Sequence, residues 1–172
     1  HEIPVVPRGA GTGVTAGATP SKGSIVLSFE KMKKIIEIDT QNLNVLCEPG
    51  LINGRLQREL EMKGFFYPPD PASMFVSTIG GNVALNAGGP RGVKYGVTRD
   101  YVLGLTIVLP TGELIKTGVQ THRGVAGYDL GRLIAGSEGT LAVITDMTLR
   151  LVPKPETQQT MVAFFENVSL AV

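Results

Sequence analysis

Two glycine-rich segments contain the residues best suited to chemistry in this sequence of 172 residues. The first runs from Arg8 to Gly13, RGAGTG, directly after a short apolar run that favours a buried strand. Glycine has no Cβ, so such a loop can bend closely around an anion and aim several backbone N–H groups at it. The segment therefore predicts a phosphate cradle, although the same pattern also fits a glycine-rich turn without a ligand.

The dinucleotide fingerprint of Rossmann folds does not explain this loop. That fingerprint needs a helix beginning inside the loop and an acidic residue about 20 positions further on, where this sequence has Glu30. Gly17, Pro20 and Gly23 disfavour any helix in this stretch. We therefore predict a phosphate cradle of a kind that has no helix.

The second segment is STIGGN, from Ser77 to Asn82, and NAGG follows it at 86–89. Hydroxyls just before a glycine pair and a short helix near 82–86 would place donors and free amides at a helix N-terminus, where negative charge is stabilised by about 0.3–1 kcal/mol. Alternatively, Ser77 or Thr78 serves only as an N-cap. A third glycine segment, GSEGT at 136–140, fits either a ligand contact or a plain turn. Two anion-type loops in one small domain suggest a diphosphate ligand.

Hydrophobic periodicity predicts the elements that must position these loops. The clearest helix is expected over 51–63, where Ile52, Leu56 and Leu60 share one face, and a shorter one over 128–135. Strands are expected at 3–6, 25–29, 34–39, 43–48, 101–109, 113–117 and 141–151, the last from strict alternation. Residues 65–99 otherwise show no period. The prediction is an α+β fold in two lobes, with 1–152 as one domain and 153–172 as a linker and the start of another.

Composition excludes several classes of protein. Sixteen Lys and Arg balance fifteen Asp and Glu, so no charge field attracts nucleic acid. The single cysteine, Cys47, cannot form an internal disulfide, and with two histidines it cannot complete a structural zinc site. We expect Cys47 to be a small core residue, and we expect a cytoplasmic protein without a metal or a transmembrane segment.

Several segments together resemble a known family. In chain order they are PRGAGTG, PPDPAS, STIGGNVALNAGG, KYG and LIAGSEGTLAVIT. They are similar to the FAD-binding domain of the FAD-linked oxidases, the vanillyl-alcohol oxidase and p-cresol methylhydroxylase type, and within it to bacterial glycolate oxidase flavoprotein subunits and D-lactate and D-2-hydroxyglutarate dehydrogenases. The resemblance covers nearly the whole chain. It implies FAD held between a small parallel-strand lobe and a larger antiparallel-sheet lobe.

The resemblance also implies roles for individual residues. The first loop would wrap the FAD pyrophosphate with backbone amides of Arg8, Gly9, Ala10, Gly11, Thr12 and Gly13. The diphosphate, ribityl and flavin region would be lined by Pro71, Ser77, Thr78, Gly81 and Asn82, while the chain would pass close to the isoalloxazine at Ala87, Gly88 and Gly89. The adenosine end would be held by Glu138 and Gly139, and backbone groups would be presented to the flavin or adenine by Ile144.

One departure from the family concerns covalent flavin. Relatives that attach FAD through the first loop carry a histidine near its end, in an RSGGH pattern, where this chain has Thr12. The histidines of this chain are His1 and His122, and we expect the latter to be an ordinary surface residue. The resemblance therefore implies non-covalent FAD.

The implied activity is that of a 2-hydroxy acid dehydrogenase or oxidase, in which a hydride passes from C2 of a glycolate- or D-lactate-type substrate to flavin N5. Partner subunits carrying flavin and iron–sulfur centres are implied, and with them a possible peripheral membrane association. In relatives a following cap domain supplies the base and the substrate-binding residues, so we assign no catalytic residue here and expect this chain alone to be inactive. Three alternatives remain: a reductase of UDP-N-acetylenolpyruvoylglucosamine type, a non-enzymatic flavin-carrying subunit, and a glycine-rich domain that binds no nucleotide.

Overall fold

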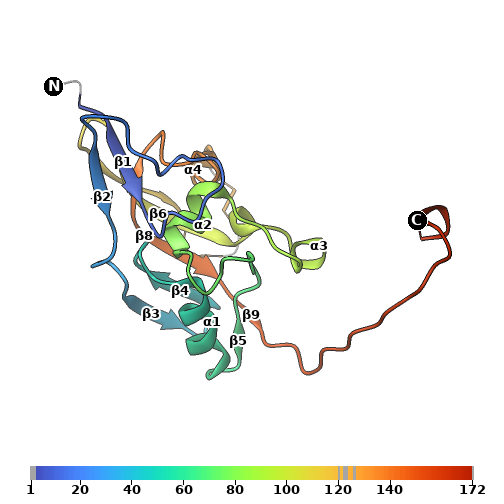
Figure 1. Ribbon diagram of the computed structural model, residues 1–172. Helices are drawn as coiled ribbons and strands as arrows, with labels where there is room; N and C mark the ends of the chain where they lie inside the picture. Colours follow the sequence, from blue (N-terminus) through green and yellow to red (C-terminus); the bar gives the residue numbers. More distant parts are fainter. Residues whose placement is uncertain (1–2, 120, 122–123, 126, 172) are drawn as a thin grey trace.

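The fold has a small parallel sheet beside a larger antiparallel sheet (Figure 1). The structure, a computed structural model, describes residues 3–119, 121, 124–125 and 127–171. Strand β1 (Val5–Arg8) pairs with β2 (Ile25–Ser28) in parallel. The five-stranded sheet has the order β3-β4-β8-β6-β7, and all of its pairings are antiparallel. The predicted α+β fold with two unequal lobes is confirmed.

Local turn chemistry explains the two hairpins of the larger sheet. Between β3 (Ile35–Asp39) and β4 (Asn44–Cys47), the Asp39 carboxylate accepts hydrogen bonds from the backbone amides of Gln41 and Asn42 at 3.0 and 2.9 Å. The Asn42 side-chain amide also donates to this carboxylate, at 2.6 Å, and it contributes most to lowering the pKa of Asp39, ahead of the two backbone amides. Between β6 (Val102–Val108) and β7 (Leu114–Gly118), Gly112 takes a φ of +88°. Both hairpins were predicted.

Four α-helices lie among these strands, and some of their bounds differ from expectation. They are α1 (Asn53–Glu61), α2 (Ile79–Leu85), α3 (Gly92–Tyr95) and α4 (Leu130–Ile134), with 3-10 turns at Thr98–Tyr101 and Val168–Leu170. Helix α2 begins three residues before the expected 82–86 because Thr78 caps it and because glycine at 80 is required by close packing on Pro49. Strands β5 (Phe65–Phe66) and β9 (Val152–Pro153) pair with each other and are too short to show a period.

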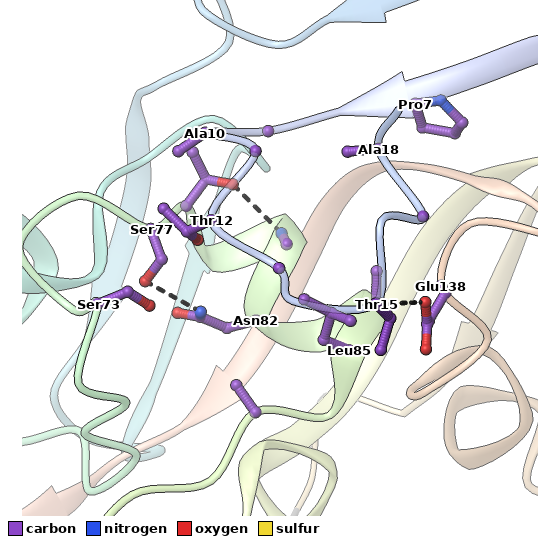
Figure 2. A pocket seen from close by; sticks show the side chains of 18 residues that line it. Pro7, Ala10, Thr12, Thr15, Ala18, Ser73, Ser77, Asn82, Leu85 and Glu138 are labelled. Atoms are coloured by element: carbon purple, nitrogen blue, oxygen red, sulfur yellow. Dashed lines mark hydrogen bonds between the residues drawn. The ribbon is translucent and has the colours of Figure 1, made fainter. Parts of the chain in front are cut away.

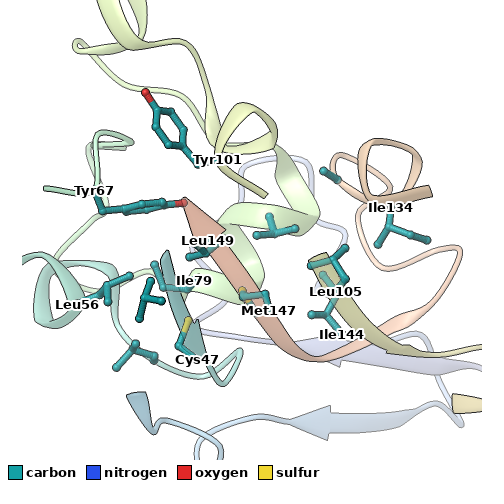
Figure 3. Close-up of a cluster of buried hydrophobic side chains, with 14 of the residues drawn as sticks. Cys47, Leu56, Tyr67, Ile79, Tyr101, Leu105, Ile134, Ile144, Met147 and Leu149 are labelled. Atoms are coloured by element: carbon teal, nitrogen blue, oxygen red, sulfur yellow. The ribbon is translucent and has the colours of Figure 1, made fainter. Parts of the chain in front are cut away.

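The core lies between the five-stranded sheet and the helices that cover one of its faces (Figure 3). Helix α1 contributes Leu56 and Leu60, and α2 contributes Ile79 and Val83. The sheet contributes buried side chains from three strands: Val45, Cys47, Leu105, Ile107, Met147 and Leu149. Because α2 is anchored in this core, the loop before it has a rigid support.

A bulge interrupts the predicted alternation in β8 (Val143–Arg150). Asp146 pairs with Thr106 and Ile144 pairs with Ile107, so Thr145 is an extra residue. Beyond it Met147, like Leu149 and Leu151, is buried, but before it the buried set is Ala142 and Ile144. The alternation over 141–151 therefore does not keep one face buried throughout, because one extra residue reverses the faces.

We expect Cys47 to resist alkylation in the folded protein. Its thiol is fully buried, and burial raises its pKa to about 12, with smaller contributions from the charges of Asp146 and Glu48. Because the thiolate is the reactive form, iodoacetamide at pH 8 should modify the chain only after unfolding in urea. Mass spectrometry of folded and unfolded samples checks this, and rapid labelling of the folded protein would contradict the core assignment.

The C-terminal residues leave the body of the molecule (Figure 1). Residues 154–167 contain no helix or strand, and all described residues from Pro153 onward are exposed. These include the large apolar side chains of Met161, Phe164 and Phe165. Within the described part of the chain, no helix is both long enough and apolar enough to cross a membrane.

Candidate nucleotide site

A hollow of about 670 Å³ lies between the loop that follows β1 and the start of α2 (Figure 2). We call the loop, residues 9–18, the cradle loop. The hollow is lined by much of that loop and by residues from α2 and the segments around it: Pro7, Gly9, Ala10, Gly11, Thr12, Gly13, Thr15, Gly17, Ala18, Ser73, Ser77, Thr78, Gly81, Asn82, Ala84, Leu85, Ala87 and Glu138.

The cradle loop offers free donors. Among the described residues, the backbone amides of residues 11–15 have no hydrogen-bond acceptor. Gly11 takes a φ of +69°, a conformation that residues with a side chain rarely adopt. The guanidinium of Arg8 lies against Gly11, since a Cβ there would be 3.0 Å from its terminal nitrogen. The loop therefore combines free amides with one positive charge, as an anion site requires.

The start of α2, by contrast, does not provide free amides. The amide of Ile79 donates to Leu51 O at 2.8 Å, and the amide of Gly80 donates to Pro49 O at 2.9 Å. The third, on Gly81, donates to the Thr78 hydroxyl at 3.3 Å. The prediction of free amides at this helix terminus is therefore wrong, because tertiary contacts and the N-cap already use them.

Thr78 connects the helix to the cradle loop. Its hydroxyl caps α2, as the N-cap alternative anticipated, and the residue is buried. A Cβ on Gly9 would overlap that hydroxyl. Only glycine at position 9 lets the loop pass this close to the helix, so Thr78 determines how near the loop amides lie to α2.

Replacing Thr78 by valine should weaken nucleotide binding and stability together. Loss of the cap should cost about 1 kcal/mol of unfolding free energy, and an unpaired polar contact in the hollow about 1–3 kcal/mol of binding. Thr78→Ser keeps the hydroxyl and serves as the control. Thermal unfolding and FAD titration of both variants check this, and full affinity in the valine variant would remove Thr78 from the site.

Glu138 closes the other side of the hollow, opposite Ser77 (Figure 2). It takes a φ of +54°, between Gly136 and Gly139, which also have positive φ. Its carboxylate accepts a hydrogen bond from the Thr15 hydroxyl at 2.7 Å and so ties the cradle loop to the turn before β8. A strained backbone at a residue other than glycine often marks a functional position. A carboxylate repels phosphate, so this end of the hollow suits hydroxyl groups.

A second hollow continues from the first beneath the cradle loop. It shares five residues with the first: Pro7, Gly9, Gly81, Ala84 and Glu138. It also contains Gly139 and Ile144, two of the predicted ligand contacts. The bulge at Thr145 sets the face on which Ile144 lies. The two hollows thus adjoin each other, and we refer to them together as the depression.

Most of the predicted site residues come together around this depression, and four lie apart from it. Those that line it are Gly9, Ala10, Gly11, Thr12, Gly13, Ser77, Thr78, Gly81, Asn82, Ala87, Glu138, Gly139 and Ile144. Arg8 contacts the cradle loop from outside the lining, while Pro71, Gly88 and Gly89 do not line either hollow. A Cβ on Gly89 would overlap the backbone of Asp70, so glycine is needed there for packing within the protein.

Asn53 and Gln57 are polar residues that the sequence did not single out. Both are buried on α1 and are hydrogen-bonded to each other at 2.7 Å. Asn53 also donates to Asn82 of the hollow at 2.9 Å. Their spacing of four residues on a helix face was the available signal, but it does not distinguish a buried pair from an exposed one.

Metal and histidine chemistry receives no support from the part of the chain that the structure describes. No group of three or more His, Cys, Asp or Glu side chains there could hold a metal ion. The expectation that His122 is a surface residue, like any statement about His1, lies outside the described residues.

Comparison with known proteins gives the family. Residues 1–118 match the FAD binding domain family. The chain is 53% identical over 171 residues to glycolate oxidase subunit GlcD of Bacillus subtilis, covering 99% of this chain and 36% of that protein. It is 45% identical over 168 residues to a D-lactate dehydrogenase of Anaerostipes hadrus, covering 98% and 35%. The chain thus spans about a third of the length of these curated relatives.

A solved structure shares the fold of this chain. Alkyldihydroxyacetonephosphate synthase is similar with a TM-score of 0.77 and 26% sequence identity, covering 90% of this chain and 30% of that one. The family match and the shared fold are consistent with a nucleotide site among the glycine loops that line the depression. This chain therefore belongs to the FAD binding domain family, and it is similar to a glycolate oxidase subunit and a D-lactate dehydrogenase.

Proposed function

We propose that this chain is the FAD-binding part of a 2-hydroxy acid dehydrogenase or oxidase and that it holds FAD without a covalent bond. The observation that carries the proposal is the cradle loop, in which Gly11, Thr12, Gly13 and Thr15 have amides without an acceptor among the described residues and line one hollow together with Ser77, Thr78 and Asn82. The substrate class is supported by the relatives, a glycolate oxidase subunit and D-lactate dehydrogenases.

The residues fit a dinucleotide in a definite direction. A diphosphate suits the end of the hollow with Gly11 to Gly13 and the Arg8 guanidinium, where donors and positive charge meet. The Glu138 end suits a ribose, because a carboxylate accepts hydrogen bonds from hydroxyl groups. Bound there, the flavin would supply hydride chemistry, accepting at N5 the hydride from C2 of the 2-hydroxy acid.

We propose non-covalent binding because the position at which covalent relatives carry histidine is Thr12, which lines the hollow and cannot form a flavin link. The side chains of the described residues around the depression hold, orient and desolvate the nucleotide. We assign none of them as the base for a hydroxyl proton, and the proposal places substrate activation in a substrate domain, of which residues 153–172 would be the linker and the start. Partner subunits carrying flavin and iron–sulfur centres belong to the same proposal.

The decisive experiment is a titration of the protein with FAD, FMN and NAD. Flavin absorbance at about 450 nm and fluorescence report binding. Saturable FAD binding with clearly weaker binding of FMN and NAD is the expected result. After acid precipitation the flavin should remain in the supernatant. Equal affinity for FMN would contradict the diphosphate assignment, and flavin in the pellet would contradict non-covalent binding. No binding at all would overturn the proposal.

A further inference from the structure

A chain of buried side-chain amides connects the hollow with the loop before α3. Arg91 donates to Gln57 Oε1 at 3.2 Å, and Gln57 Nε2 donates to Asn53 Oδ1 at 2.7 Å. Asn53 Nδ2 donates to Asn82 Oδ1 at 2.9 Å, and Asn82 Nδ2 donates to Ser77 Oγ at 3.1 Å. We call Gln57, Asn53 and Asn82 the amide relay. All three are at least 96% buried, with exposed fractions of 4%, 0% and 3%.

At the Arg91 end of the amide relay, the hydrogen bonds can run in only one direction. Arg91 can only donate, and it is held by the Asp70 carboxylate, which lies 3.5 Å from its Nε and accepts from its backbone amide at 3.1 Å. The Pro69 carbonyl can only accept, and Gln57 Nε2 donates to it at 2.9 Å. If the Gln57 amide were reversed, its oxygen would face the Pro69 oxygen and its NH2 would face the guanidinium. These two contacts therefore orient Gln57.

This orientation is passed along the relay. Because Gln57 donates to Asn53 Oδ1, the Asn53 NH2 group faces Asn82, and it also lies 3.4 Å from Pro69 O. Asn82 must then accept at Oδ1, which turns its NH2 group toward Ser77. Ser77 Oγ receives that hydrogen bond, and its own hydroxyl hydrogen has no acceptor among the described residues.

We propose that the amide relay makes Ser77 a hydrogen-bond donor into the hollow and that Gln57 and Asn53 are positioning residues for it. Ser77 is 2% exposed and lines the hollow, whereas Gln57 and Asn53 do not. The Ser77 hydrogen would be satisfied by an acceptor on the ligand, either a phosphate oxygen or an acceptor atom of the flavin ring.

The proposal rests on FAD binding, and a double-mutant cycle separates the two ideas. Ser77→Ala should weaken FAD binding about tenfold, because a donor to the ligand is lost. Gln57→Met should weaken it several-fold in the wild-type background but have no effect in the Ser77→Ala background, because Gln57 acts through Ser77. Gln41→Met, the same exchange in the exposed β3–β4 turn, is the matched control and should leave affinity unchanged.

A near-isosteric variant tests the direction of the relay. In Gln57→Glu, Arg91 keeps its acceptor, but no donor faces Asn53 Oδ1. The Asn53 and Asn82 amides should then turn round, and the Ser77 hydroxyl should donate to Asn82. FAD affinity should fall about as far as in Ser77→Ala. This variant keeps the test available if the methionine variant does not fold.

ADP and riboflavin, measured by competition with FAD, locate the acceptor. If Ser77 donates to a phosphate oxygen, Ser77→Ala and Gln57→Glu should weaken the binding of ADP but not that of riboflavin. If Ser77 donates to the flavin ring, only the binding of riboflavin should weaken. Equal weakening of both ligands, or full additivity of Gln57→Met and Ser77→Ala, would show a general structural role and overturn the inference. Wild-type protein that binds no FAD would instead overturn the proposed function.

Discussion

Gly11→Val should abolish saturable FAD binding, with a loss of affinity of about 100-fold or more. Gly11 takes a φ of +69°, which a β-branched residue adopts only at a cost of about 1–2 kcal/mol. A Cβ there would also lie 3.0 Å from Arg8 Nη2 and displace the guanidinium. The loop would change its path, and the free amides of residues 11–15 would be displaced. FAD titration of purified variant and wild-type protein measures the effect.

Gly112→Val controls for backbone strain. Gly112 also takes a positive φ, +88°, and a Cβ there would meet no atom within 4 Å. It lies in the β6–β7 turn and does not line either hollow. The FAD affinity of the Gly112→Val variant should equal that of the wild-type protein, although its backbone is similarly strained. Unchanged affinity in the Gly11 variant would exclude the cradle loop from the site.

Gly89→Ala should lower the free energy of unfolding by about 2–3 kcal/mol, a value typical of overpacking. The new Cβ would overlap both the backbone and the carboxylate of Asp70. Asp70 would have to move, and it would release the backbone amide and guanidinium of Arg91. Urea unfolding followed by circular dichroism measures the loss.

The neighbouring glycine provides the comparison. In Gly88→Ala the Cβ would lie 3.4 Å from Val97 Cγ1, an ordinary contact, so stability should change by less than about 0.5 kcal/mol. The resemblance had implied that both glycines pass close to the flavin. If both variants lost FAD affinity with unchanged stability, that shared role would hold, and the packing explanation for Gly89 would fail.

Much of the local structure follows from the sequence alone. The β3–β4 and β6–β7 hairpins follow from runs of strand-forming residues separated by short polar or glycine turns, and α1 follows from its apolar face. These features depend on interactions between residues close in the chain. The glycine segments could also be recognised from the sequence, because a sharply bent backbone requires glycine whatever the tertiary structure around it.

Helix α2 and the bulge at Thr145 show where local patterns fail. Free amides seemed to be available at a capped glycine pair, but Pro49 and Leu51, about thirty residues earlier in the chain, accept two of them. The sequence alternates over 141–151, but pairing with β6 inserts an extra residue and reverses the buried face. In both cases the partner is distant in sequence, so no local pattern could report it.

The α+β class, the hairpins and the glycine loops that form the cradle could be predicted from the sequence, because turn geometry and hydrophobic period are local properties. Which donors remain free among the described residues, namely the amides of residues 11–15 and the Ser77 hydroxyl, depends instead on tertiary contacts. The tertiary structure also decided that Gln57 and Asn53, which looked like ordinary helix residues, are buried against Asn82. A donor is free only when every other group has found its partner, and that condition depends on the whole fold.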